Sequence, residues 1–201
     1  MEILNPQKLQ DLNEKEPIYT KIIIAGGVNV GKTLFMKRIN IIKKGEEFNI
    51  ENFDKNYTPT IGRDFTKFVF EINDKLYKVQ FWDVSGQDRW ENTVYYIARG
   101  AGAILLFYDS FNRDSFLKAK KLHTNLYESH PESIYALVRS KYDLALKEEN
   151  NDIVSDEEAL EFANNNNIIF AHLSNFEKYE IGTNELFLKI ILKIENYLKI
   201  E

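Results

Sequence analysis

The sequence predicts an α/β fold in which helices flank a mostly parallel sheet. Three observations support this prediction. Short runs rich in β-branched and apolar residues recur along the chain, stretches with helical apolar spacing separate them, and a glycine-rich loop joins the first run to the first helical stretch. Strands that alternate with helices in this way form parallel sheets flanked by helices. The 201 residues fit one domain, residues 19–201, preceded by an N-terminal extension of residues 1–18.

The first strand is expected at residues 21–25, and it leads into the pattern G-x-x-x-x-G-K-T from Gly26 to Thr33. Apolar residues at helical spacing follow. Glycines adopt backbone angles that other residues resist, so main-chain N–H groups of this loop can converge on phosphate oxygens at the start of the helix. Lys32 adds a point charge, and the Thr33 hydroxyl can coordinate Mg²⁺. An ordinary glycine turn before a helix is the alternative for this segment alone.

A β-hairpin is expected next, with strands at residues 67–72 and 75–82 joined by Asn73 and Asp74, a turn-favouring pair. The second strand leads into Asp83. Its carboxylate should therefore lie at the carboxyl end of a strand, which is the edge where open α/β sheets bind ligands. An aspartate at this edge can hold Mg²⁺ through a water molecule.

Gly86 and Gln87 complete the pattern Asp-x-x-Gly-Gln. Gly86 can bring a backbone N–H close to a terminal phosphate. Gln87 has an amide donor and an acceptor, so it can orient an attacking water without titrating. Thr60, which lies between the glycine-rich loop and the hairpin, offers a mobile hydroxyl as a further magnesium ligand. The pattern is weak alone, but after a phosphate loop and a threonine it indicates a nucleoside triphosphatase.

Recognition of a guanine base is indicated by residues that follow the predicted strand at 134–138, namely Ser140, Lys141 and Asp143. The Asp143 carboxylate can accept hydrogen bonds from the ring N–H and the exocyclic amine of guanine. The Lys141 stem can cover one face of the base. Surface decoration is the alternative for Lys-x-Asp standing alone.

A weaker indication follows the predicted strand at residues 168–172, where backbone N–H groups of Ser174 and Asn175 can donate to the guanine carbonyl. Residues 111–128 predict a helix on which Lys118, Lys120 and Lys121 are most simply a solvated face. Ser155 with acidic residues behind it predicts a capped helix start. The last helix, which includes residues 187–198, has one apolar face, expected to be core.

With these motifs the chain resembles the Ras superfamily of small GTPases, and the Rab branch most closely. The resemblance covers roughly Tyr19 to Lys199 and implies the P-loop GTPase fold, with a mostly parallel six-stranded sheet, one antiparallel strand and about five helices. The motifs that carry it are Gly26 to Thr33, Tyr57-Thr58-Pro59-Thr60-Ile61-Gly62, Trp82-Asp83-Val84-Ser85-Gly86-Gln87-Asp88-Arg89, Arg99-Gly100-Ala101, Tyr108-Asp109, Arg113-Asp114-Ser115-Phe116 and Lys141-Tyr142-Asp143-Leu144.

The resemblance implies a switch that binds GDP and GTP with Mg²⁺ and hydrolyses GTP. Two segments, from Phe53 to Phe65 and from Asp83 to Arg99, would order with GTP and present themselves to effector, exchange-factor and GTPase-activating proteins. Metal ligands are expected at Thr33, Thr60 and, through water, Asp83. Gln87 is the expected catalytic residue. The expected nucleotide contacts are Gly26, Val28, Asn29, Val30, Gly31, Lys32, Thr33, Leu34, Phe53 (packed against guanine), Tyr57 (over the phosphates), Thr60, Asp83, Gly86, Ser140, Lys141, Asp143, Ser174 and Asn175.

Three departures from the family pattern concern function. Val28 stands where relatives often carry glycine or serine, and its branched side chain should crowd the space beside the terminal phosphate, which predicts slow hydrolysis. Ser140 stands where most relatives carry asparagine, and its shorter side chain predicts faster nucleotide release. Asn175 and Phe176 replace the usual alanine and lysine, so only the backbone part of that base contact is expected.

Composition excludes several classes of protein. The net charge of −5, from 26 basic and 31 acidic residues, argues against a non-specific nucleic-acid binder. No apolar run is long enough to span a membrane. The chain has no cysteine, which excludes disulfides and leaves no residue for prenylation. A cytoplasmic monomer is expected, with membrane association left open.

Three functions compete at this stage. The leading one is a GTP-hydrolysing switch, with a role in vesicle traffic suggested by the Rab resemblance. The second is a nucleotide-locked GTP-binding scaffold with little or no turnover, which Val28 favours. The third is a P-loop kinase or ATPase, against which Thr60, Gln87 and Asp143 argue.

Overall fold

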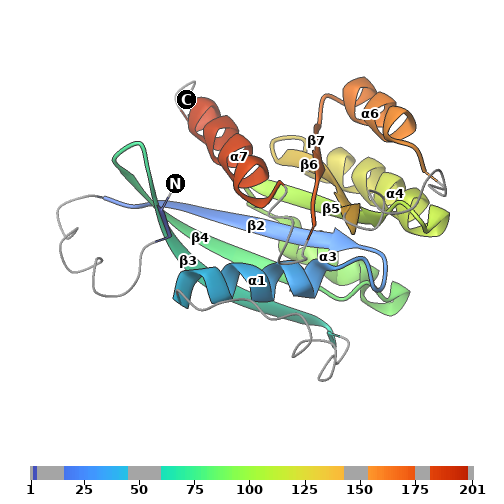
Figure 1. The fold of residues 1–201 in the computed structure, drawn as a ribbon, viewed down its shortest axis with the longest axis horizontal. Coiled ribbons are helices and arrows are strands. Elements are labelled where there is room, and N and C mark those ends of the chain that lie inside the picture. The colour runs from blue at the N-terminus through green and yellow to red at the C-terminus, as the bar shows by residue number, and fades with distance from the viewer. Residues whose placement is uncertain (1, 4–15, 45–59, 143–153, 175–181, 199–201) are drawn as a thin grey trace.

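The computed structural model describes residues 2–3, 16–44, 60–142, 154–174 and 182–198 (Figure 1). Strands and helices alternate along these ranges as the sequence predicts. In chain order the elements are β1 (Glu2–Ile3), β2 (Ile18–Gly26), α1 (Lys32–Lys44), β3 (Arg63–Ile72), β4 (Lys75–Val84), the 3₁₀ turn η2 (Asp88–Trp90), α3 (Glu91–Ala98), β5 (Ala103–Asp109), α4 (Arg113–Ser129), β6 (Ile134–Ser140), α6 (Asp156–Asn165), β7 (Ile169–His172) and α7 (Thr183–Leu198).

The strands form one sheet in the order β1-β3-β4-β2-β5-β6-β7. Strands β4, β2, β5, β6 and β7 run parallel to one another, and β3 is antiparallel to β4. This confirms the mostly parallel six-stranded sheet with one antiparallel strand. The described residues add a short edge strand, β1, which pairs antiparallel with β3 and contains two residues. They also contain five α-helices, the expected number.

The predicted hairpin is confirmed, and its strands are longer than the sequence indicated. Asn73 and Asp74 both have positive φ, 50° and 59°, and they join β3 to β4. Two consecutive residues in this conformation form the turn whose twist matches that of paired antiparallel strands. Asp83 consequently lies at the carboxyl end of β4, beside Ile24 of β2.

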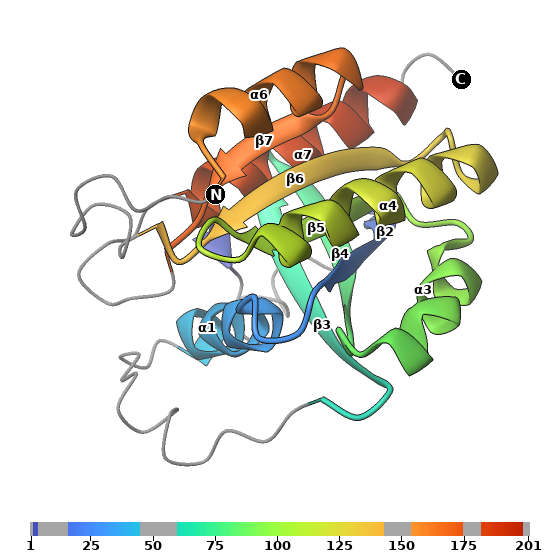
Figure 2. The ribbon, with the colours of Figure 1, turned by 90° about the vertical axis from the view of Figure 1, so that its right-hand side faces the viewer.

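Two apolar cores form on the two faces of the sheet because successive residues of a strand point in opposite directions. In β2, Ile22 and Ile24 pack in the core with α1 and α7, while Ile23 and Ala25 pack in the core with α3, α4 and α6. Figure 2 shows the strands between these helical layers. Strand β5, which is buried along its whole length, contributes to both cores.

Two helices on the second face begin at side-chain caps. The carbonyl oxygen of the Asn112 side chain accepts a hydrogen bond from the Ser115 backbone N–H at the start of α4. Ser155 caps α6 through the Glu158 backbone N–H, as predicted. These caps satisfy N–H groups that a helix start leaves unpaired. No helix in the described ranges is both long enough and apolar enough to cross a membrane.

Candidate functional site

The glycine-rich loop lies between β2 and α1, at the carboxyl edge of the sheet. Asn29 and Gly31 have positive φ, 60° and 84°. A Cβ on Gly26 would lie 2.2 Å from the backbone oxygen of Phe107, so only glycine fits where the loop leaves β2 beside β5. The Lys32 ammonium donates hydrogen bonds to the backbone oxygens of Gly26 (3.2 Å) and Gly27 (2.5 Å), which turns the lysine back over the loop.

Lys32 is buried, and burial lowers the pKa of its ammonium from 10.5 to about 8. The nearby Asp83 carboxylate opposes this shift, and the charge of Lys118 adds to it. A buried ammonium with an unfavourable solvation energy gains by contact with an anion. The loop therefore presents main-chain N–H groups and one poorly solvated positive charge, which are the features of a phosphate site.

Three oxygen-bearing side chains from three separate segments meet beside this loop. The Thr33 hydroxyl donates to Asp83 Oδ2 at 2.5 Å and lies 2.9 Å from the Thr60 hydroxyl oxygen, and the Thr60 hydroxyl donates to Asp83 Oδ2 at 3.2 Å. The structure thus brings together the three residues predicted as metal ligands, although 50 positions separate Thr33 from Asp83 along the chain.

The donor set of this cluster fits Mg²⁺. Asp83 is buried, and its Oδ1 has no hydrogen-bond partner among the described residues. Burial is the main cause that raises the pKa of this carboxyl, which shows that its charge lacks full compensation by the protein. Hard hydroxyl and carboxylate oxygens are what Mg²⁺ prefers, and Mg²⁺ usually takes few protein ligands beside water and substrate phosphates.

Gly86 lies directly against the glycine-rich loop. A Cβ on Gly86 would lie 2.3 Å from the backbone oxygen of Gly27 and 2.6 Å from the backbone N of Val28. A small pocket opens here, with Val28, Gln87 and the threonine pair in its lining. Gln87 lines this pocket, and its amide oxygen accepts a hydrogen bond from Arg89 Nε at 2.9 Å.

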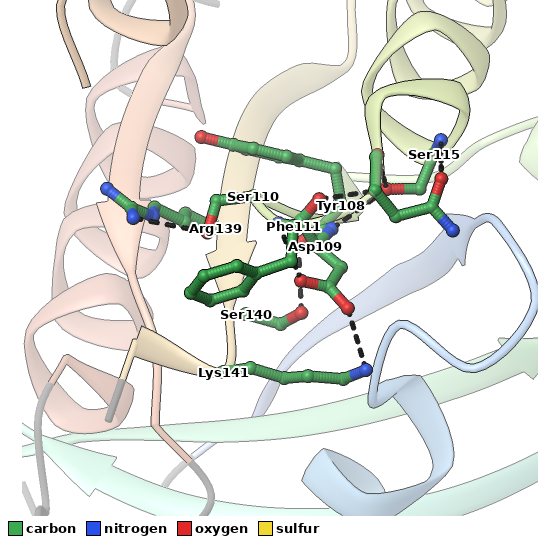
Figure 3. A network of polar contacts seen from close by, with 9 residues as sticks. Tyr108, Asp109, Ser110, Phe111, Ser115, Arg139, Ser140 and Lys141 are labelled. Atoms are coloured by element: carbon green, nitrogen blue, oxygen red, sulfur yellow. Dashed lines mark hydrogen bonds and ion pairs between the residues drawn. The ribbon is translucent and has the colours of Figure 1, made fainter. Parts of the chain in front are cut away.

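The segment predicted to recognise a base begins at the end of β6, where Figure 3 shows a polar network. The Ser140 hydroxyl is fully buried and donates to the Tyr108 carbonyl at 2.9 Å. Lys141 has a φ of 56°, and its ammonium pairs with Asp109 Oδ2 at 2.7 Å. Both side chains therefore contact the end of β5, Ser140 through the Tyr108 carbonyl and Lys141 through the Asp109 carboxylate.

The ends of β6 and β7 are tied together, which brings the two predicted base-contacting segments side by side. The Tyr142 backbone N–H donates to the Leu173 carbonyl at 3.2 Å. The Arg38 guanidinium, buried in α1, donates to the Ser174 carbonyl at 2.9 Å. Arg38 was missed by sequence reasoning because its position in α1 gave no sign that it reaches a segment 136 residues away.

A second buried arginine was also missed. Arg139 of β6 is 2% exposed, and it donates to Asp156 Oδ1 at 2.5 Å and to the Ser110 hydroxyl at 3.1 Å. Asp156 also contacts His172 Nε2 at 2.8 Å, and the His172 ring stacks on Tyr142. This cluster braces the segment after β6 against α6 and β7.

We expect this cluster to make stability depend on pH through Asp156. Burial favours the neutral carboxyl, but hydrogen bonds from His172 and Arg139 hold the pKa of Asp156 below its ordinary value of 3.8. The stabilisation is therefore present above that ordinary value and is lost as pH falls through the lower folded value. Because the side chain is 38% exposed, Asp156→Asn should cost only about 1 kcal/mol of unfolding free energy at pH 7.

Urea unfolding of both proteins at pH 7 and pH 3 checks this expectation. The difference between Asp156→Asn and the parent should shrink at pH 3. Glu161→Gln, which removes a carboxylate from an exposed position of the same helix, serves as the control. An equal cost for Asp156→Asn at both pH values would contradict the assignment.

Several predicted contact residues lie outside the described ranges, namely Phe53, Tyr57, Asp143 and Asn175. Most of the first segment that is expected to order with GTP, namely residues 53–59, lies outside them too. The second one, residues 83–99, is described throughout and contains η2 and α3. Among the remaining predicted contact residues, Val30 of the loop is buried, Leu34 of α1 is half-buried and Asn29 is exposed.

Comparisons with known proteins agree with this geometry. Residues 21–196 match the family model described as Ras family. The chain is 32% identical over 161 residues to the human "Ras-related protein Rab-17", covering 79% of this chain and 69% of that protein. It is 32% identical over 187 residues to "Ras-related protein Rab-4" of Dictyostelium discoideum, covering 90% and 84%. It is 31% identical over 179 residues to "Ras-related protein RABA6b" of Arabidopsis thaliana, covering 89% and 72%. The chain therefore belongs to the Ras family and is a Rab-like small GTPase, an enzyme that hydrolyses GTP.

Proposed function

We propose that this chain is a guanine-nucleotide switch that binds GDP and GTP with Mg²⁺, hydrolyses GTP slowly and signals the presence of the third phosphate to partner proteins. One observation supports it above all others. Thr33, Thr60 and Asp83 converge next to the buried ammonium of Lys32, at the mouth of a phosphate-type loop. No simpler role explains a poorly solvated cation beside a carboxylate whose second oxygen finds no partner in the described chain.

Each group in this arrangement has a separate task. Loop N–H groups and Lys32 bind the diphosphate, because charge-assisted hydrogen bonds to phosphate are about twice as strong as neutral ones. Thr33 and Asp83 would hold Mg²⁺, which neutralises phosphate charge as the terminal bond breaks. Thr60 acts as the sensor of the third phosphate, since it comes from a segment separate from the loop and from β4.

Gln87 is proposed to orient the attacking water. In the described conformation its amide oxygen is hydrogen-bonded to Arg89, so the amide must exchange this partner for the attacking water before hydrolysis. This requirement is a second cause of slow turnover, beside the bulk of Val28, which is 52% exposed at the pocket rim. The locked scaffold with little turnover remains the second candidate because of these two residues.

Guanine specificity is proposed for the segments after β6 and β7, with Asp143 as the acceptor and the backbone N–H groups of Ser174 and Asn175 as donors. The support is that Tyr142 is hydrogen-bonded to Leu173, so that the two segments approach the same ligand. Phe53 and Tyr57 are proposed to cover the base and the phosphates.

The test begins with the nucleotide that copurifies with the protein, identified after denaturation. GDP or GTP is expected, and GTP should compete for the site far more strongly than ATP. Phosphate release from protein loaded with GTP should then be slow but measurable, and it should stop when Mg²⁺ is chelated. Preference for ATP would contradict guanine recognition, and complete absence of phosphate release would favour the locked scaffold.

The parent protein, with Ser140, is expected to release nucleotide faster than a variant with asparagine at that position. The Ser140 hydroxyl is bonded to the Tyr108 carbonyl, so this hydrogen bond ties it to β5 and not to the phosphate loop. Ser140→Asn should slow GDP dissociation by about tenfold, the effect of one additional hydrogen bond of about 1.4 kcal/mol. Release of a fluorescent GDP analogue measures it, and slower release from the parent than from the variant would contradict the expectation.

Partner proteins are proposed to bind the surface formed by the segments from Phe53 to Phe65 and from Asp83 to Arg99. Within the described part of that surface, Phe65 is exposed and stacks on Trp82 with ring centroids 5.1 Å apart. Exposed aromatic rings are common anchors in protein interfaces. A role in vesicle traffic, as a cytoplasmic monomer that meets membranes through partners, is proposed on the similarity to Rab proteins.

A further inference from the structure

Helix α4 contacts residues 83–99, the second segment expected to order with GTP, through a row of polar side chains. Lys118, Lys121 and Asn125 follow one another at helical spacing on one side of α4. Lys118 contacts Gly86 and Asp88, Lys121 pairs with Glu91 at 3.0 Å, and Asn125 donates to the Tyr95 hydroxyl oxygen at 3.0 Å. The prediction that the lysines of this helix are simply solvated is therefore wrong for Lys118, whose side chain is 18% exposed.

Lys118 differs from the other members of this row because it reaches the backbone next to the expected catalytic residue. Its ammonium donates to the Gly86 carbonyl at 2.7 Å and to Asp88 Oδ1 at 2.6 Å. The Gly86 carbonyl belongs to the peptide that links Gly86 to Gln87. Holding this oxygen fixes the plane of that peptide, and hence the Cα from which the Gln87 side chain turns.

Of the two interactions of Lys118, the hydrogen bond to the Gly86 carbonyl contributes more than the ion pair with Asp88. Asp88 is 92% exposed, and exposed ion pairs contribute little because water and salt screen them. The hydrogen bond to the Gly86 carbonyl is instead partly buried, and Gly86 itself lies so close to the phosphate loop that a Cβ on it would overlap Gly27. A hydrogen bond from a charged donor is strong in such a place.

The helix that carries Lys118 is a rigid support. Phe116, Ala119 and Leu122 of α4 are buried in the core of the second face, and Asn112 caps its start. Lys118 is therefore attached to an element that lies outside the two segments expected to order with GTP. Lys118 also lines a pocket together with Val28, Gln87 and the start of α4, so it borders the same open space as the expected catalytic residue.

We propose that Lys118 is a positioning residue for GTP hydrolysis, which holds the Gly86–Gln87 peptide against the phosphate loop so that Gly86 meets the third phosphate and Gln87 meets the water. This inference rests on the proposed function of the same site. Lys118 acts through the backbone and does not touch the reacting atoms. Its loss should affect the GTP state and hydrolysis while leaving the grip on GDP unchanged.

The experiment compares Lys118→Met, which keeps the length of the side chain and removes the ammonium, with Lys118→Arg as the conservative variant. Lys121→Met is the matched control, because it removes a neighbouring charge and the Glu91 pair without touching Gly86. Asp88→Asn removes only the exposed partner. Single-turnover hydrolysis and the affinities for GDP and a non-hydrolysable GTP analogue are measured for each full-length protein.

Lys118→Met is expected to slow hydrolysis roughly ten- to a hundredfold, since small misplacements near a reacting centre have effects of this size. It should weaken binding of the GTP analogue several-fold and leave GDP binding unchanged. Lys118→Arg should restore most of both losses, and Lys121→Met and Asp88→Asn should resemble the parent. Tryptophan fluorescence reports changes in this segment, because Trp90 lies two positions after Asp88 and next to Gly62.

Two results would overturn the inference. One is that Lys118→Met keeps the parent's hydrolysis rate and preference for the GTP analogue. The other is that it weakens GDP and GTP binding equally, which indicates a general structural role. If the parent protein shows no measurable hydrolysis, that result contradicts the proposed function and not the role of Lys118. In that case the role of Lys118 is decided only by whether Lys118→Met reduces the preference for the GTP analogue over GDP.

Discussion

Lys32→Ala is expected to lose GDP and GTP almost completely. The ammonium is buried and turned back over the phosphate loop, where it donates to the Gly26 and Gly27 carbonyls. Removing one member of a buried charge pair costs about 3–5 kcal/mol, which corresponds to an affinity roughly a hundred- to several-thousandfold lower. The lowered pKa of Lys32 shows that its burial is unfavourable without an anion, so the loss should appear in binding more than in folding.

Titration with a fluorescent GDP analogue measures this effect, and circular dichroism shows whether the variant folds. Lys32→Met keeps the apolar stem of the side chain and guards against a packing defect. Lys37→Ala removes the same charge from an exposed position of the same helix and should bind as the parent does. Parent-like retention of nucleotide by folded Lys32→Ala would falsify the proposed grip on the diphosphate.

The sequence was sufficient to predict the backbone wherever its conformation depends on residues that are adjacent in the chain. The glycine-rich loop could be placed because Gly26 and Gly31 occupy backbone angles that other residues resist, and the hairpin turn because Asn73 and Asp74 tolerate positive φ. The capped start at Ser155 has the same character. Such features are encoded within a few residues, so a single sequence is enough to predict them.

Contacts between distant segments could be predicted only where chemistry demanded them. A metal that needs oxygen ligands required Thr33, Thr60 and Asp83 to meet, and the structure brings them together. No comparable requirement indicated that Arg139 would reach Asp156, or that Lys118 would reach Gly86. A lysine on a helix has the same appearance in sequence whether it meets water or a carbonyl.

The contacts of Ser140 and Lys141, two of the residues predicted to bind the base, could not be predicted from the sequence either. The sequence indicated that Ser140 has less reach than asparagine, but its actual acceptor, the Tyr108 carbonyl, depends on the pairing of β6 with β5. The Lys141 ammonium likewise meets Asp109 because the two strands end at the same level of the sheet. Register between parallel strands is set by packing over the whole domain, which a short motif does not contain.

Val28→Gly is expected to accelerate single-turnover hydrolysis about tenfold without an activating protein, because it removes an obstacle to the arrangement of water around the third phosphate. Val28 lines both the pocket beside the threonine pair and the more open space toward Lys118, and its backbone N lies close to Gly86. Its side chain thus occupies a region that both Gln87 and an external arginine would have to share.

The larger effect is expected with an activating protein. An arginine supplied in trans accelerates hydrolysis about 10³- to 10⁵-fold in Ras with its activating protein, and Val28 should suppress most of this gain by bulk alone. Val28→Ala provides the graded control, since a methyl group should give a rate between those of the parent and Val28→Gly. GDP release should be the same in all three proteins, because the obstacle concerns only the third phosphate. Equal hydrolysis rates for the parent, Val28→Ala and Val28→Gly, with and without an activating protein, would show that turnover is limited elsewhere, with the Gln87–Arg89 hydrogen bond as the next candidate.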